Sequence, residues 1–150
     1  MINFNIKDIK KDINYNIKLQ EFLSENDNTV FEYGKNDCLL FTAKAIEAMA
    51  LDYKVVDDVK SQFNYRSQSG AAKALLKLGY KSPMEMLEAN AIKLANIYQV
   101  KTGDIAIIKN ELGEMSSGVV CGPFVFGPSD RGLARVSIME IYAAYTWGKE

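Results

Sequence analysis

One cysteine of the chain stands where a nucleophile could be activated. Cys38 lies in the segment YGKNDCLLFTAKAIEAM, residues 33–49, directly after Asn36 and Asp37 and at the start of an apolar run. Unpaired backbone N–H groups and the macrodipole at a helix N-terminus lower the pKa of a thiol there, and the thiolate is the reactive form. The sequence therefore predicts a nucleophilic thiol at Cys38, with a buried structural cysteine as the alternative.

A cysteine nucleophile needs a partner that accepts its proton, and this chain contains no histidine. The remaining candidates are carboxylates, at Asp37, Asp104, Glu111 and Glu114. A carboxylate is a weaker base than an imidazole, and its negative charge disfavours a thiolate beside it. The composition therefore favours a protein without peptidase catalysis. If the chain is an enzyme, Cys38 and Asp37 are its catalytic candidates.

The segment that begins at Cys38 is expected to form a buried helix over 38–50. Either Asn36 or Asp37 can cap it, because both side chains accept a backbone N–H. Apolar residues surround the helix axis on all sides, and the polar interruptions are Thr42, Lys44 and Glu47. A helix that is apolar all round is buried all round, so we expect this one to be the central helix of the domain.

Helices are also expected before and after this central segment. The first, over 6–26, has apolar residues at spacings of three and four. Residues 52–69 are predicted to be a polar loop, and the stretch FNYRSQSG at 63–70 could line a groove or bind a partner. Further helices are predicted over 70–79 and from Ser82 onward, where proline follows and a glutamate stands three positions on.

The second part of the chain changes to short apolar runs separated by turn residues, which is typical of strands. Four strands in an antiparallel meander are predicted, at 103–110, 117–122, 124–126 and 133–136. The final segment SIMEIYAAYTWG, in which Ser137 and Glu140 are spaced as a capping box, is predicted to be a helix. Helices first and strands later indicate an α+β domain with helices on one face of a small antiparallel sheet.

Length and composition indicate one domain over residues 1–150, with residues 1–30 as a helical extension. The 18 basic and 19 acidic residues leave no basic surface of the kind that binds nucleic acid. No apolar run reaches the length of a membrane span, and the N-terminus lacks the apolar core of a signal peptide. The two cysteines, Cys38 and Cys121, show no zinc-ligand spacing, so neither a metal nor another cofactor is expected.

Several segments of the chain, taken in order, resemble a group of phage-encoded proteins that is similar to the NlpC-type papain-like cysteine peptidases. These segments are YGKNDCLLFTAKAIEAM, FNYRSQSGAAKALLKLGY, KTGDIAII, SSGVVCG, GLARV and AAYTWG, and they fall within residues 30–148. The resemblance implies a papain-like fold. It places Cys38, after Asp37, at the nucleophile's position, and it makes Gly103 and Asp104 the opening of the sheet.

In those peptidases the catalytic histidine opens the next strand, in the order histidine, any residue, glycine and an apolar residue. The matching stretch here is Ser116, Ser117, Gly118 and Val119, so a serine stands where the histidine would be. A serine hydroxyl does not take up a proton near neutral pH, and the phage group tends to lack that histidine too. The resemblance therefore carries over the fold and a phage context, but not the activity. The remains of the site are expected at Gly103, Asp104, Ser116 and Ser117.

Three functions are compatible with these observations. The leading expectation is a catalytically inactive structural protein of a phage virion or tail, whose partners are other tail proteins. One alternative is a phage peptidoglycan endopeptidase or amidase that uses Cys38 with a partner other than histidine. The other is a small module that binds a host protein through the remnant groove. The expected location is the virion tail, after synthesis in the host cytoplasm.

Overall fold

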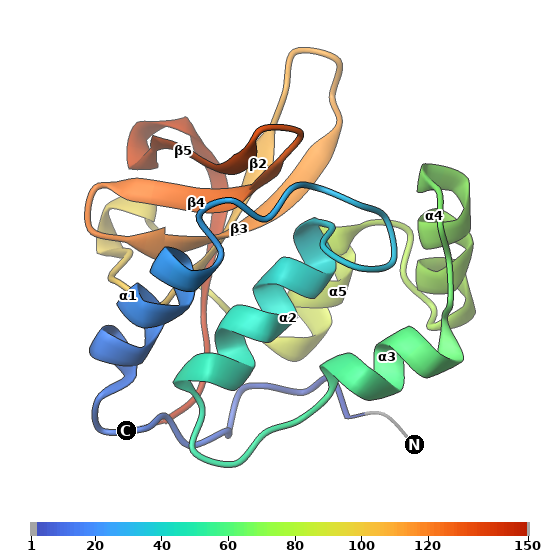
Figure 1. Cartoon of the computed structure of the whole chain (residues 1–150). Helices are drawn as coiled ribbons and strands as arrows, with labels where there is room; N and C mark the ends of the chain where they lie inside the picture. The colour runs from blue at the N-terminus through green and yellow to red at the C-terminus, as the bar shows by residue number, and fades with distance from the viewer. Residues whose placement is uncertain (1–2, 150) are drawn as a thin grey trace.

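Residues 3–149 are described by the computed structural model, in which five α-helices accompany one six-stranded antiparallel sheet (Figure 1). This is the expected α+β class. The helices are α1 (Tyr15–Glu25), α2 (Cys38–Met49), α3 (Val56–Gln62), α4 (Gln68–Lys77) and α5 (Pro83–Asn90). The strands are β1 (Ile92–Lys93), β2 (Ile105–Lys109), β3 (Met115–Cys121), β4 (Phe124–Ser129), β5 (Gly132–Ser137) and β6 (Ile141–Thr146).

The sheet has the strand order β1-β6-β2-β3-β4-β5. Strands β2 to β5 follow one another as neighbours, so the predicted four-stranded meander is confirmed. Strand β6 returns from the end of the chain and pairs between β1 and β2. The meander therefore becomes part of a wider sheet, whose centre includes the last strand of the chain.

Helix α2 lies at the centre of the main core, where it packs on β3 and on α1. Its buried apolar residues are Leu40, Phe41, Ala45, Ile46 and Met49, and the other positions of the helix are at least half-buried. The predicted central helix is therefore confirmed, with its start at Cys38. Leu19 and Leu23 of α1 and Leu87 of α5 complete the core on the same face of the sheet.

The N-terminal helix is shorter than predicted, because α1 begins only at Tyr15. The preceding residues are held by backbone contacts with distant parts of the chain instead. Ile6 is buried, its N–H donates to the carbonyl of Asn90, and its own carbonyl accepts the N–H of Gly148. These tertiary hydrogen bonds satisfy the backbone without a helix, which outweighs the local helical spacing.

The predicted loop over 52–69 contains helix α3, so that prediction is wrong for Val56–Gln62. The reason lies outside the segment. The carboxylate of Glu47, on α2, accepts the backbone N–H groups of Val55 and Val56 at 2.5 and 2.7 Å. These are donors that a helix start leaves without partners, and a side chain from another helix satisfies them here. The capping prediction for α5 is confirmed, since the Ser82 hydroxyl accepts the N–H of Glu85.

The last segment is strand β6 rather than the predicted helix. The Ser137 hydroxyl does accept the N–H of Met139, but the helical conformation ends after the single 3₁₀ turn Ile138–Glu140. Strand β6 then pairs on both edges and has buried residues on both faces of the sheet. A strand buried on both faces has a continuous apolar sequence, which resembles a buried helix as closely as it resembles a strand.

The opposite face of the sheet carries a second, smaller core. Its buried members are Ala106, Val120, Val125, Ile141 and Ala144. Partly buried side chains at Leu94, Ile97, Val100 and Ile138 cover part of this cluster. Within residues 3–149, no helix combines the length and the apolar character needed to cross a lipid bilayer.

A tight contact between β3 and β4 gives a direct test of this sheet. A Cβ added at Gly118 would lie 2.7 Å from the Phe126 carbonyl oxygen and 2.7 Å from Val125 Cγ1. Gly118→Ala is therefore expected to lower the free energy of unfolding by about 1–3 kcal/mol. Urea unfolding, followed by the fluorescence of the single buried tryptophan Trp147, measures the change.

Gly127→Ala is the matched control, because a Cβ there meets nothing closer than 3.8 Å and neither glycine has a positive φ. Equal stability losses in Gly118→Ala and Gly127→Ala would contradict the register of β3 against β4.

Candidate functional site

The start of α2 is fixed by the buried carboxylate of Asp37. Asp37 Oδ1 accepts the backbone N–H of Leu40 at 2.9 Å, as an N-cap residue does. Asp37 Oδ2 accepts the N–H of Gly34 at 2.9 Å and the hydroxyl of Tyr65 at 2.6 Å. Of the two predicted caps, Asp37 is therefore the one used. Its side chain also joins the turn before α2 to the loop before α4.

Asn36, the other predicted cap, has a different role. Its Nδ2 donates to the carbonyl of Val30 at 3.1 Å, and this contact ties down the segment before the helix. Its buried Oδ1 has no hydrogen-bond partner within residues 3–149.

Cys38 is the first residue of α2 and its side chain is half-buried. Burial raises the pKa of the Cys38 thiol, and the negative charge of Asp37 adds to that rise. Hydrogen bonding from Ser117 and from the backbone of Leu39 acts in the opposite direction and does not offset burial. The predicted lowering of the thiol pKa is therefore wrong, because desolvation outweighs the helix terminus at this position.

The two serines of the SSGV stretch lie on opposite faces of β3. Ser117 is buried against α2, and its hydroxyl donates to the carbonyl of Cys38 at 3.0 Å. The hydroxyl of Thr42 donates to the same carbonyl at 2.8 Å and lies 2.9 Å from Ser117 Oγ. Ser116 is exposed, on the face of β3 away from α2. The residue that reaches Cys38 is therefore Ser117, whereas Ser116, which matches the histidine of the sequence pattern, does not.

Gly103 and Asp104 lie at the other end of α2. A Cβ added at Gly103 would approach Met49, the last residue of a helix that is about 17 Å long. Asp104 is fully buried and closes the turn before β2, where its carboxylate accepts the backbone N–H and the ammonium of Lys101. Asp104 therefore caps this turn, and it is too far along the helix to serve Cys38 as a base.

The other two carboxylates proposed as bases lie near the β2–β3 turn. Glu111 and Glu114 are both exposed, and Glu114 bonds to the side chain of Asn110 through its backbone N–H and its carboxylate. Glu114 also lies close enough to Tyr33 to raise the pKa of that phenol, after the larger contributions of burial, Cys38 and Asp37. Tyr33 therefore lies among negative groups beside Cys38.

Tyr65 also belongs to this site. The sequence predicted only that the stretch 63–70, which contains it, could line a groove or bind a partner. Burial raises its pKa, and the adjacent negative charge of Asp37 raises it further. The phenol consequently stays protonated and keeps donating to the Asp37 carboxylate. Tyr65 is thus a fixed donor within the site.

In the part of the chain that the structure describes, the polar side chains next to Cys38 are bonded to groups other than its thiol. Both oxygens of Asp37 are occupied by N–H and O–H donors, and the hydroxyl of Ser117 is directed at a backbone carbonyl. The neighbouring polar groups therefore fix the backbone at the start of α2 and do not take a proton from Cys38. Over residues 3–149, the cysteine and carboxylate side chains form no group of three or more that could hold a metal ion. Both cysteines are free thiols.

Removal of the Asp37 carboxylate is expected to destabilise the protein more than removal of an ordinary helix cap. Asp37→Ala takes away a cap and leaves the N–H of Gly34 and the hydroxyl of Tyr65 without their acceptor. The expected loss is about 2–4 kcal/mol in the free energy of unfolding. Ser82→Ala, which removes the cap of α5 alone, is the control, with an expected loss of about 1 kcal/mol. Equal losses for the two variants, measured by urea unfolding, would contradict the role given to Asp37.

Comparison with known proteins gives a family but no activity. A search of curated proteins finds no match to the chain. The family model described as "Domain of unknown function (DUF6950)" matches residues 10–147, from the segment before α1 to the end of the sheet. The match covers most of the chain and includes every residue of the site around Cys38. The chain therefore belongs to this family of unknown function, DUF6950.

Proposed function

We propose that the chain is a structural protein of a bacteriophage virion or tail, built on a papain-like fold and without peptidase activity. The observation that carries the proposal is the contact between Ser117 and Cys38. A cysteine peptidase of the papain type places a proton acceptor beside its thiol. In this chain the β3 side chain that reaches the start of α2 is Ser117, and its hydroxyl donates to the Cys38 carbonyl at 3.0 Å.

The arrangement of the core supports the papain-like part of the proposal. Helix α2, whose first residue is Cys38, is buried and packs on the antiparallel sheet. Strand β2 follows the Gly103-Asp104 turn and leads into β3, which faces Cys38. This is the order of elements that the resemblance to NlpC-type peptidases implies. The phage context rests on the same resemblance, and so do the virion location and the tail-protein partners.

The thiol itself argues against catalysis. Its pKa is raised, so the thiolate is scarce near neutral pH, and the adjacent carboxylate of Asp37 disfavours it further. The bonds from Thr42 and Ser117 to the Cys38 carbonyl suit a structural position, because they join the first turn of α2 to β3. Peptidoglycan is therefore not the partner that this geometry favours.

Replacement of Cys38 in the phage tests the proposal. Phage that carry Cys38→Ala are expected to assemble normally and to infect as well as the wild type, because the sulfur has no chemical role. Quantitative mass spectrometry of purified particles is expected to find the chain in them. Cys121→Ala, which changes the chain's other cysteine, at the end of β3, is the matched control.

Particles that assemble with Cys38→Ala but lose infectivity would contradict the proposal, and so would purified virions that lack the chain. The purified wild-type protein is expected to release no soluble muropeptides from peptidoglycan. A release that Cys38→Ala abolishes and Cys121→Ala preserves would establish the peptidase instead.

A further inference from the structure

A cavity of about 100 Å³ lies among helices α2, α3, α4 and α5. Its walls are almost entirely apolar, and four helices contribute to them. The side chains that define it include Ala43 and Ile46 of α2, Val59 of α3, Ala74 and Leu75 of α4, and Leu87 of α5.

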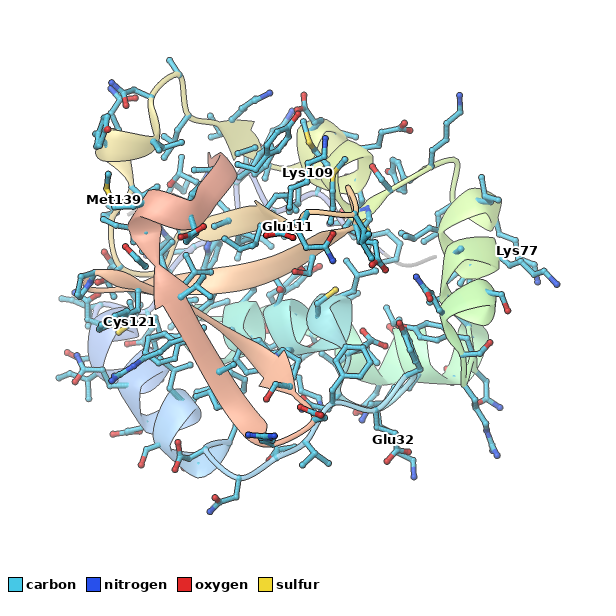
Figure 2. All side chains as sticks on the ribbon, turned by 90° about the horizontal axis from the view of Figure 1, so that it is seen from above. Glu32, Lys77, Lys109, Glu111, Cys121 and Met139 are labelled. Atoms are coloured by element: carbon cyan, nitrogen blue, oxygen red, sulfur yellow. The ribbon has the colours of Figure 1, made fainter. Side chains whose placement is uncertain are left out.

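The cavity exists because small side chains stand where α2 and α4 face each other. Figure 1 shows α4 at the edge of the molecule, apart from α2 and α5. Lys77 points outward from α4 into solvent in Figure 2, so the helix presents its other side to the cavity. That side carries Ala71 and Ala74, and α2 contributes Ala43. Alanine side chains are too short to fill the space between the two helices.

The few hydroxyl groups in the lining already have partners inside the protein. Thr42 and Ser117 are 2.9 Å apart, Tyr53 donates to the Asn3 carbonyl, and Tyr65 donates to Asp37. Ordered water in a protein interior is held by two to four polar partners, which this lining does not offer. The cavity is therefore suited to apolar atoms and not to water or to a charged group.

We propose that this cavity is a binding site for a small uncharged apolar molecule of about the size of one aromatic ring. An apolar cavity of roughly 150 Å³ lined by leucine, isoleucine and phenylalanine takes up benzene. The present cavity has similarly apolar walls and a volume about one third smaller. Many of its lining residues, Val59 and Ala74 among them, are half-buried, so a ligand reaches it from solvent with little rearrangement. This proposal does not depend on the proposed function.

Benzene is the probe for the test, added to the full chain labelled with ¹⁵N. Saturable shifts are expected in the amide signals of the cavity helices, at residues such as Ile46 and Leu75. Ala74→Phe places a ring in the cavity and is expected to weaken benzene binding by about tenfold or more. Ala72→Phe makes the same change on the exposed side of α4 and is expected to leave the affinity unchanged.

The absence of saturable amide shifts in the wild-type protein would overturn the proposal. Amide shifts centred on the face of the sheet that carries the second core, around Val120 and Ala144, would also overturn it. Unchanged benzene affinity in a folded Ala74→Phe variant would overturn it as well. If Ala74→Phe does not give the dispersed spectrum of a folded protein, Ala74→Val takes its place. A weaker affinity in Ala74→Val supports the proposal, and an unchanged one overturns it.

Discussion

The start of helix α2 depends on one buried carboxylate. A buried negative charge is stable in a protein only when donors surround it, and Asp37 has three, from Gly34, Leu40 and Tyr65. These donors come from the turn before the helix, from its first turn and from the loop before α4. The same interaction therefore sets the position of α2, the path of the chain into it and the place of the loop that carries Tyr65.

The role of Cys38 follows from that constraint. Because Asp37 is committed to its donors, it is not free to accept the thiol proton, and its charge raises the thiol pKa beyond the effect of burial. The Cys38 carbonyl accepts hydroxyl groups from Thr42 and Ser117, so the residue contributes to the junction of α2 and β3 through its backbone. The backbone of Cys38 thus serves the packing of α2 on the sheet.

Features with local signals were predictable from the sequence, and features set by distant residues were not. Nearby residues are enough to predict the apolar residues on all sides of α2, a cap at Asn36 or Asp37, the cap at Ser82 and the meander of β2 to β5. Helix α3 has no local start signal, because its cap comes from Glu47 on another helix. The sequence of strand β6 resembles that of a buried helix, because a strand buried on both faces shows no alternation of apolar and polar residues.

The site shows the same division. Asp37 and Cys38 could be identified as candidate residues from the sequence. The direction in which the Cys38 pKa shifts could not, because burial of the thiol depends on how the whole sheet packs. The choice of Ser117 over Ser116 had no local signal, because β3 is buried on both faces from Ser117 to Val120 and its sequence does not alternate. The match to a histidine pattern indicates Ser116, whereas the packing of β3 on α2 places Ser117 against Cys38.

The most direct test of this account is the ionisation of the Cys38 thiol itself. A pH titration of the Cys38 ¹³Cβ signal by NMR, in the Cys121→Ser variant, reports this group alone. The account predicts a thiol that stays protonated through neutral pH, because burial and the charge of Asp37 raise its pKa above that of an ordinary cysteine. A midpoint below neutral pH would contradict it, because such a thiolate is an activated nucleophile and Cys38 would have to be treated as catalytic.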